Sequence, residues 1–432
     1  MASRIGSPLN GLSVLSFARD LWTDVPRCRH HVLSRLAPSS RVLFVSPPAT
    51  HIRDAVRKVS RGGLAQSGLT EVSPELFSFV PPPWLPYSDR PFIDRALEVA
   101  RAGYIRHLLN RLGMQHPILY VWHPAFIDMV ERFDAPLVVY HCYDEYGAFR
   151  GAKRQEIEAQ EARLLRRADL VFTVSSGLRE RRVGLNPNTF VVHNGVDADS
   201  FATALAPETV VAPDIASIRR PIVGCISRVV PEYFDAALLR DVVRKRRDWS
   251  LVVIGPESPP QEFGGDDLER LKAEPNVHFL GMRPFESLPS YLKAMDVCTI
   301  PYRVTGNTQL ADPLKLYEYL AAGKPIVSVP RDFADDVRPF VRTGADADEW
   351  VRAIDESLTL DSPELCAARQ AVAQDNTWDQ RIDQISHLIR GALARREGAS
   401  RPGRDLWRID HQARHPAAAS ASTRGTTTRS HE

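Results

Sequence analysis

The sequence predicts an α/β fold built on parallel sheets, and three observations support this prediction. Residues 12–17 and 41–45 are short apolar runs, and residues 30–36 between them have the pattern of a helix. Residues 296–329 repeat this order of apolar run, helix and apolar run. A strand, a helix and a second strand in this order form one turn of a parallel α/β sheet. The 432 residues are enough for two or three domains, each with its own core.

The first half of the chain alternates apolar runs with helical patterns. We expect strands at 12–17, 41–45, 118–122, 137–140, 168–176 and 190–197. We expect helices at 30–36, 94–111 and 156–167. Residues 46–90 read as irregular, with a short basic amphipathic helix at 52–60. That helix suits a membrane surface, and a solvated loop is the alternative.

The second half repeats the alternation. We expect strands at 222–226, 249–255, 276–281, 296–301 and 326–329. We expect helices at 287–295, 313–322, 346–358, 363–374 and 375–396. The resulting domain prediction is a first domain at 1–205, a linker at 206–220, a second domain at 221–374, a final helix at 375–396 and a disordered tail at 397–432.

Composition limits the classes of function. A net charge of +2 gives no global field to attract nucleic acid, so we expect no nucleic-acid partner. The five cysteines are scattered without a C-x-x-C pair, which fits a reducing compartment and predicts no zinc site. The N-terminus lacks the apolar core of a signal peptide, and no apolar run approaches the ~20 residues that span a bilayer. We therefore expect a cytoplasmic protein that can still touch the inner face of the membrane.

The helix at 313–322 carries the clearest functional pattern. Asp312 suits the N-cap, Pro313 and Leu314 open the helix, and Gly323 suits a left-handed stop. Lys315 adds a cation to a first turn whose dipole is already positive. Free N–H groups and a lysine at the carboxyl end of a parallel strand form a natural diphosphate site.

Glu318 lies one turn further along the same face of this helix. Its carboxylate could accept hydrogen bonds from a ribose bound beside the diphosphate. The alternative is a solvated pair of Lys315 and Glu318, worth a few tenths of a kcal/mol.

Three further residues follow apolar strands of the first half. His123 comes after the run at 118–122, and His141 and Asp144 come after the run at 137–140. The carboxyl ends of parallel strands are where sites form in such sheets. A helix cap or a turn is the alternative for each of them.

The loop at 18–29 is rich in arginine and follows the first strand. It contains Trp22, Arg27 and Arg29. Guanidinium groups can bind a phosphate by charge and by bidentate hydrogen bonds. A solvent-exposed basic loop is the alternative.

Several stretches resemble a known family. "PLKLYEYLAAGKPIVS", "VVYHCYDEY" and "HNGVD" are similar to segments of the group 1 glycosyltransferases, in particular to a subgroup of bacterial polysaccharide and teichuronic-acid-type synthesis. The resemblance covers about residues 10–395. It implies the GT-B fold, with two facing Rossmann-like domains and a final helix that crosses back to the first. In "HNGVD" we expect Asn194 and Gly195 to use positive φ in a tight turn.

The resemblance also assigns roles on the donor side. Arg228 matches a diphosphate-binding arginine, whereas Tyr233 stands where the family has a lysine, so we expect Lys315 to complete the clamp with Arg228. Glu318 matches the ribose-binding glutamate of a family pair. Leu310 occupies the position of the other glutamate.

Neighbouring polar residues could take over the role of that absent glutamate, and these are Gly306, Asn307 and Thr308. Arg283 follows a strand whose end brackets the base in the family. Asp144, His123 and His141 become the residues expected to face the reacting sugar. Trp22, Arg27 and Arg29 become an acceptor-side loop.

The predicted function is transfer of a sugar from a nucleotide-diphosphate donor to a glycan or lipid-linked acceptor. The resemblance implies retention of anomeric configuration and no bound metal or other cofactor. Two alternatives stay open. One is a nucleotide-sugar epimerase on the same fold, and the other is a non-catalytic partner subunit, since one family glutamate and one family lysine are absent.

Overall fold

The structure is a computed structural model that describes residue 9 and residues 11–48, 50–53, 67–149, 151–231, 233–258 and 265–399. Residues 1–393 form one compact unit, and residues 394–432 form a second. Residues 54–60 of the helix predicted at 52–60 lie outside the described residues. So does the predicted tail from residue 400 on.

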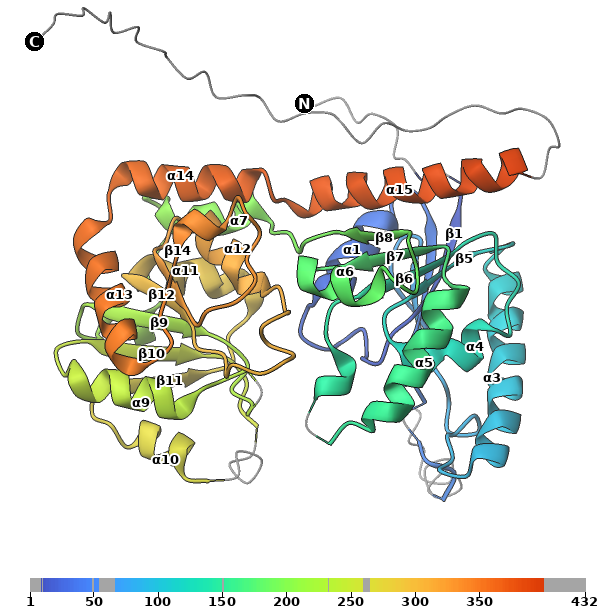
Figure 1. Ribbon diagram of the computed structural model, residues 1–432, viewed down its shortest axis with the longest axis horizontal. Coiled ribbons are helices and arrows are strands. Elements are labelled where there is room, and N and C mark those ends of the chain that lie inside the picture. Colours follow the sequence, from blue (N-terminus) through green and yellow to red (C-terminus); the bar gives the residue numbers. More distant parts are fainter. Residues whose placement is uncertain are drawn as a thin grey trace, which may run out of the picture. The chain divides into compact units, whose positions relative to one another are not determined.

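The first unit contains two sheets with helices on both faces (Figure 1). Among the described residues, the first sheet has eight strands in the order β3-β4-β2-β1-β5-β6-β7-β8. They are β1 (Ser13–Phe17), β2 (Arg41–Val45), β3 (Gly68–Ser73), β4 (Leu76–Val80), β5 (Ile118–Val121), β6 (Val138–Cys142), β7 (Leu170–Thr173) and β8 (Thr189–Val191). All neighbours are parallel except β3 and β4.

The second sheet is parallel throughout, with the order β11-β10-β9-β12-β13-β14 in the part of the chain described. Its strands are β9 (Ile222–Ile226), β10 (Ser250–Ile254), β11 (Val277–Gly281), β12 (Val297–Ile300), β13 (Ile326–Ser328) and β14 (Val341–Thr343). The two sheets lie on either side of the predicted linker at 206–220. This arrangement confirms the predicted α/β class with two parallel-sheet domains.

Helices connect the strands of both sheets. Those within the first half are α1 (Cys28–Leu36), η1 (Pro124–Phe126), α3 (Pro91–Arg111), α4 (Ile127–Val130), η2 (Tyr146–Ala148), α5 (Arg154–Arg167) and α6 (Ser176–Arg182). Those that follow are α7 (Ala198–Ala202), η3 (Thr203–Leu205), α8 (Pro213–Ala216), α9 (Ala236–Lys245), α10 (Asp267–Lys272), η5 (Phe285–Ser287), α11 (Leu288–Ala294), α12 (Leu314–Ala321), η6 (Arg338–Phe340), α13 (Ala347–Leu360), α14 (Pro363–Gln374) and α15 (Trp378–Ala399). Within the described ranges, none of them is both long enough and apolar enough to cross a bilayer.

The hairpin of β3 and β4 corrects the prediction of an irregular segment at 46–90. The two strands pair antiparallel, and β4 adds to the edge of the sheet beside β2. Most residues of β3 are exposed or half-buried, so the strand lacks the apolar run by which buried strands are recognised.

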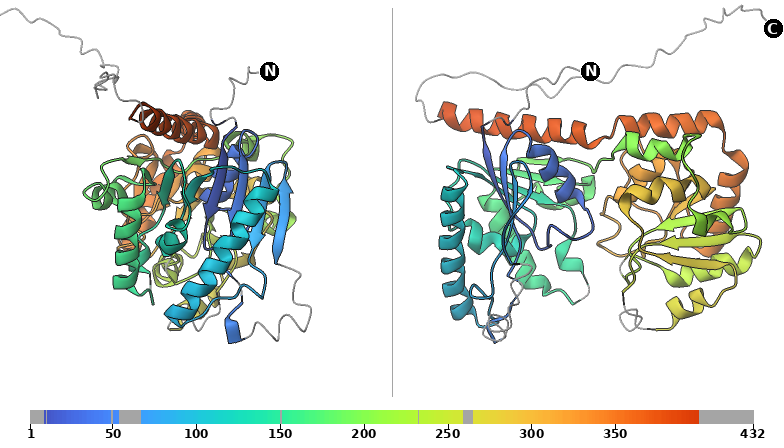
Figure 2. Two further views of the ribbon diagram at one scale, coloured as in Figure 1. Left: turned by 90° about the vertical axis from the view of Figure 1, so that its right-hand side faces the viewer. Right: turned by 180° about the vertical axis from the view of Figure 1, so that it is seen from behind.

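The last helix packs on the first sheet, as predicted. Trp378, Ile385 and Ile389 are almost fully buried and belong to the same apolar cluster as the strand residues Val14 and Phe172. Figures 1 and 2 show α15 running beside that sheet. Burial of large apolar side chains is the main stabilising force in such packing, at roughly 1.5–3 kcal/mol per side chain.

Glycine is needed at position 195 for a reason other than the predicted positive φ. Gly195 is not among the described glycines with positive φ, whereas Gly323 has φ +67° and ends α12 as predicted. A Cβ on Gly195 would lie 2.8 Å from the backbone nitrogen of Trp378. The glycine is therefore needed where the start of α15 approaches the chain.

Candidate functional site

A cavity of about 1070 Å³ brings together residues from both sheets. Four predicted site residues line it, and these are Arg27, His123, Asp144 and Arg228. His123 and Asp144 follow strands β5 and β6, and Arg228 follows β9. The carboxyl ends of parallel strands supply them, as expected for an α/β site.

Asp144 is linked to the second sheet through Tyr233. The Tyr233 hydroxyl donates to Oδ1 of Asp144 at 3.4 Å, and Nδ2 of Asn307 donates to the Tyr233 oxygen at 3.4 Å. Oδ1 of Asn307 in turn accepts from the backbone N–H of Glu145 at 2.9 Å. Asn307 is thus buried in a network that joins the loops after β6, β9 and β12, instead of pointing freely toward a donor.

The surroundings of Asp144 in the cavity change the pKa of its carboxyl group. Burial raises the pKa of Asp144 to about 7, against the lowering effect of Arg27, Arg29 and the Tyr233 hydrogen bond. The group therefore exchanges protons near neutral pH, which suits acid–base chemistry.

The two predicted site histidines, His123 and His141, lie in different surroundings. Nδ1 of His123 accepts from the backbone N–H of Ala125 at 3.1 Å, so this residue caps η1 while its ring also lines the cavity. Burial, together with Arg19 and Arg29, lowers the pKa of His123 to about 3. The imidazole is neutral at physiological pH.

His141 lies inside β6 instead of beyond its end, and only 1% of its surface is exposed. Its Nδ1 is 2.9 Å from the Tyr120 hydroxyl, and its ring stacks on Trp122. Burial lowers its pKa to about 3. The expectation that His141 faces a sugar is corrected by this placement, because the strand runs two residues longer than predicted.

Two of the residues predicted for the basic loop after β1 are held by packing, although residues 23–26 of that loop are exposed. Arg29 is fully buried, pairs with Asp20 and lies over the ring of Tyr143. Trp22 packs edge-on against Phe44. Both residues therefore support the loop from within, which corrects the prediction that Arg29 meets a ligand.

Arg27 does reach the cavity. It is the N-cap residue of α1, its side chain is one-third exposed, and its Nη1 lies 3.6 Å from Oδ1 of Asp20.

Helix α12 begins one residue later than predicted. Pro313 is its N-cap residue, and no side chain caps the helix. Asp312 serves another purpose, because its Oδ2 accepts from the backbone N–H of Asn194 at 2.7 Å and its Oδ1 accepts from the Tyr317 hydroxyl at 3.1 Å. The "HNGVD" segment therefore anchors the start of α12, a tertiary role beyond the predicted turn.

Lys315 lies beside the loop that follows β9. Its Nζ donates to Oγ of Ser227 at 2.8 Å and lies 4.9 Å from the centroid of the Tyr302 ring. Ser227 directly precedes Arg228, whose side chain is exposed. Lys315, in the first turn of α12, thus contacts the residue that directly precedes Arg228.

Glu318 makes no ion pair with Lys315 among the described residues, so the solvated-pair alternative is not what the structure shows. Burial raises the pKa of the Glu318 carboxyl to about 7, and Lys315 opposes that shift.

Sequence reasoning missed Arg331. Its guanidinium lies 4.8 Å from the Tyr302 ring centroid, on the ring that Lys315 also contacts, and it donates to the backbone oxygen of Thr308. Thr308 is buried, and its hydroxyl donates to the backbone oxygen of Arg303. Arg331 and Thr308 therefore shape the loop at 303–310, and only this fold brings them together.

Three other residues predicted to bind the sugar donor make packing or ion-pair contacts within the protein. Pro313 is buried and Leu314 is half-buried against the apolar cluster of the first sheet. Arg283 pairs with Asp214 at 2.7 Å. A base contact by Arg283 stays a prediction.

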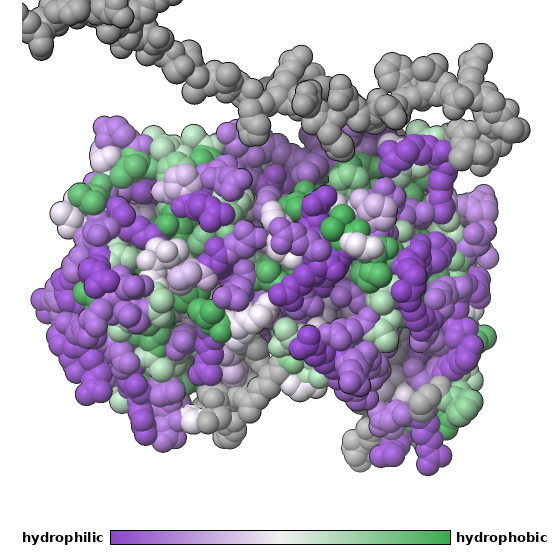
Figure 3. Space-filling model, in the orientation of Figure 1, coloured by the Kyte–Doolittle hydropathy of each residue, from purple (hydrophilic) through white to green (hydrophobic). Residues whose placement is uncertain are grey.

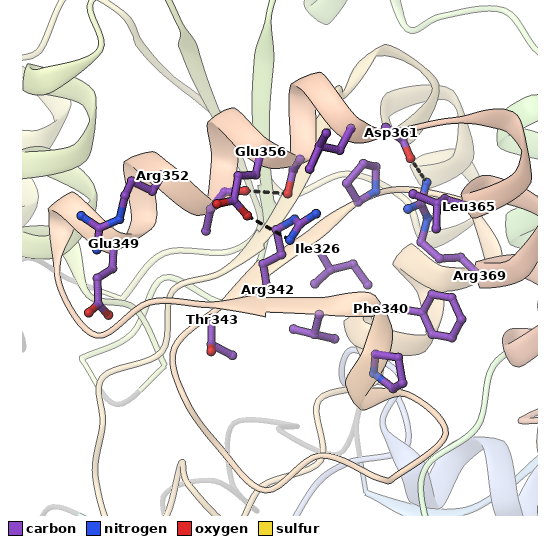
Figure 4. A pocket seen from close by; sticks show the side chains of 16 residues that line it. Ile326, Phe340, Arg342, Thr343, Glu349, Arg352, Glu356, Asp361, Leu365 and Arg369 are labelled. Carbon is purple, nitrogen blue, oxygen red and sulfur yellow. Dashed lines mark hydrogen bonds and ion pairs between the residues drawn. The ribbon is translucent and has the colours of Figure 1, made fainter. Parts of the chain in front are cut away.

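A second cavity, of about 480 Å³, lies between β14 and helices α13 and α14 (Figure 4). Two of its three arginines form ion pairs, since Arg342 binds Glu356 and Arg369 binds Asp361. None of the predicted site residues lines it.

Comparison with known proteins places the chain among sugar-transferring enzymes. Residues 220–359 match the family model "Glycosyl transferases group 1". A putative teichuronic acid biosynthesis glycosyltransferase, TuaH, of Bacillus subtilis is 25% identical over 286 residues, which cover 62% of this chain and 70% of the relative. A GDP-mannose-dependent alpha-(1-6)-phosphatidylinositol monomannoside mannosyltransferase of Mycolicibacterium smegmatis is 28% identical over 256 residues, 53% of this chain and 64% of that relative.

Solved structures share the fold. A sucrose-phosphate synthase from Thermosynechococcus elongatus superposes with a TM-score of 0.65 at 17% identity, covering 89% of this chain and 100% of the other. Anabaena Alr3699/HepE in complex with UDP-glucose superposes with a TM-score of 0.60 at 15% identity, covering 88% and 100%. At these identities the likeness concerns the fold alone.

Proposed function

We propose that the chain is a group 1 glycosyltransferase with the GT-B fold, and that it transfers a sugar from a nucleotide-diphosphate donor to a glycan or lipid-linked acceptor in cell-surface polysaccharide synthesis. The observation that carries this proposal is the hydrogen bond from Lys315, in the first turn of α12, to Ser227, which directly precedes Arg228 in the chain. An anionic diphosphate fits two cations and a set of free helix N–H groups.

The proposed chemistry needs charge stabilisation at the leaving group. As the bond between the anomeric carbon and the phosphate oxygen breaks, negative charge grows on the diphosphate. Arg228, Lys315 and the N-terminus of α12 would stabilise that charge without a metal ion. The acceptor oxygen would form the new bond, and Asp144, which lines the cavity, would take up its proton. We propose retention of configuration on the strength of the family likeness.

We propose that the acceptor side contacts a membrane surface. Trp84 is 56% exposed and Phe92 is 92% exposed, and the exposed Arg90 and Arg95 flank Phe92. Exposed aromatic and cationic side chains together suit an anionic lipid interface. The face drawn in Figure 3 is mostly covered by hydrophilic side chains, with apolar ones in small groups.

Product release tests the proposal against its two alternatives. Purified protein would be incubated with uridine and guanosine diphosphate sugars, with and without an extract of bacterial envelope lipids and glycans. Release of nucleoside diphosphate that requires the extract supports a transferase. An isomerised donor without extract would identify an epimerase. Donor binding without any turnover would identify a non-catalytic subunit.

A further inference from the structure

The side chain of Asn307 is bonded to two groups that adjoin Asp144. Its Oδ1 accepts from the backbone N–H of Glu145, the residue after Asp144, at 2.9 Å. Its Nδ2 lies 3.4 Å from the Tyr233 oxygen, and that hydroxyl lies 3.4 Å from Oδ1 of Asp144. Only 2% of the surface of Asn307 is exposed, so the protein itself supplies the partners of this amide.

The chemistry of these groups fixes the direction of the hydrogen bonds. A backbone N–H can only donate, so the amide oxygen of Asn307 faces Glu145 and the NH2 group faces Tyr233. A tyrosine hydroxyl carries one proton and can also accept. Because the Tyr233 oxygen accepts from Asn307, its own proton is left for Asp144. The amide therefore aims the tyrosine proton at the carboxyl group.

The loop at 303–310 holds Asn307 in this position. The backbone oxygen of Leu310 accepts from the Ser175 hydroxyl at 2.7 Å. The Leu310 side chain lies so close to Gly177 that a Cβ on that glycine would be 2.5 Å from it. The loop follows β12 of the second sheet, whereas Ser175 and Gly177 follow β7 of the first. Contacts with the first sheet's elements therefore fasten the loop that carries the amide.

Other titratable groups also face Asp144 or line the same cavity. Burial raises the pKa of Asp144, two arginines at the start of α1 lower it, and Glu145 adds to the rise. Among the described residues, Tyr233 is the titratable group that both donates to Asp144 and bonds to the Asn307 side chain. The full set of other groups is Arg27, Arg29, His123, Tyr143, Glu145, Tyr146 and Arg228.

Resting on the proposed function, we propose that Asn307 is a positioning residue for Asp144, because it directs the hydroxyl proton of Tyr233 toward that carboxyl group. A loop of the second sheet thereby controls how firmly a carboxyl group after the first sheet holds its proton. The substitution Asn307→Asp reverses the direction with little change in shape. A carboxylate still accepts from Glu145, but it also accepts the proton of Tyr233, so Asp144 loses its donor.

The test follows the protonation of Asp144 in the full chain by NMR, with 13C at the carboxyl carbon of the aspartates. Adding Asp144→Asn to each variant identifies the signal. The variants are Asn307→Asp, Tyr233→Phe and the two together. Asn110→Asp is the control, because Asn110 is exposed on α3 and outside the cavity lining, and the change adds the same charge.

We expect Asn307→Asp to move the Asp144 titration upward by about one pH unit, and by clearly less when Tyr233→Phe has already removed the hydroxyl. Asn110→Asp should leave the titration in place. If Asn307→Asp does not fold, Asn307→Ala replaces it and should give a smaller rise, since Tyr233 loses the donor that orients it.

An unchanged titration in the Asn307 variant would overturn the proposal. An equal rise with and without the Tyr233 hydroxyl would also overturn it, by assigning the effect to charge alone. Neither outcome depends on turnover. Failure of the proposed function shows separately, as absent release of nucleoside diphosphate by the wild type.

Discussion

The ammonium group of Lys315 donates a hydrogen bond to Oγ of Ser227 across 2.8 Å. This contact joins the first turn of α12 to the loop after β9, in which Ser227 directly precedes Arg228. The family lysine of that loop is replaced by Tyr233, so the cation comes from another element. The predicted clamp would therefore draw on two elements, while Tyr233 donates a hydrogen bond to Asp144.

Asp144 is expected to give the reaction a pH dependence. Its pKa of about 7 means that the carboxyl is mainly protonated below neutral pH and ionised above it. If the ionised form takes up the acceptor proton, kcat/KM rises as the pH increases through 7. Asp144→Asn should abolish that rise and lower activity by roughly 10²-fold or more. A profile unchanged in the variant would contradict the assignment.

The same group affects stability with the opposite sign. Its pKa in the folded protein lies above the ordinary value of 3.8, so the folded state holds the proton between pH 4 and 7 more firmly than the unfolded chain does. Stability due to this group is lost as the pH rises through 7. Above that pH, Asp144→Asn should unfold at higher urea concentration than wild type.

Tyr233→Phe tests the link between the sheets. The variant removes the donor to Asp144, a bond that lowers the pKa of that carboxyl. We expect the rising limb of the kcat/KM profile to move to higher pH, with a stability loss of about 0.5–1.5 kcal/mol. Tyr87→Phe is the matched control, because Tyr87 lines the cavity without an Asp144 contact. An identical shift in both variants would rule out this link.

Asp312→Ala tests the anchor of α12. Loss of the carboxylate leaves the backbone N–H of Asn194 without its partner, which should cost about 1–3 kcal/mol of unfolding free energy. Asp335→Ala is the control, since Asp335 is fully exposed and its ion pair with Arg338 spans 3.7 Å. Urea denaturation of both variants gives the comparison. A loss no larger than that of the control would show that Asp312 does not anchor the helix.

Gly195→Ala tests the close approach of α15. The added methyl group would lie 2.8 Å from the backbone nitrogen of Trp378, so we expect a loss of about 1–3 kcal/mol. Gly103→Ala, in α3, has no atom within 4 Å of the new Cβ and should stabilise by about 0.5–1 kcal/mol. Thermal or urea unfolding separates the two, and equal stability of both variants would contradict the steric argument.

Buried regular elements were predictable because their residues carry the pattern themselves. The apolar runs of β9 and β12 and the glycine stop of α12 are local signals. The sequence also predicted that Asp144 and Arg228 each follow a parallel strand. The structure places them after strands of different sheets, and both line the cavity, while their roles stay predictions.

What the sequence could not show depends on tertiary partners. Arg29 and Arg27 look alike in the chain, yet Asp20 and Tyr143 enclose Arg29 and leave Arg27 at the cavity. Arg331 carries no motif, and its contacts with Tyr302 and Thr308 arise only in the fold. β3 was missed because an exposed edge strand has no continuous apolar run.

The most direct test of the donor clamp is nucleotide binding by wild type, Lys315→Ala and Arg228→Ala. Titration calorimetry with uridine and guanosine diphosphates would measure it, with Lys245→Ala as the control because Lys245 lies in the same domain and pairs with Asp348 at the surface. We predict that one nucleoside diphosphate binds the wild type and that each clamp variant binds it roughly tenfold to a hundredfold more weakly. Binding of equal strength by the clamp variants and the control would contradict the account.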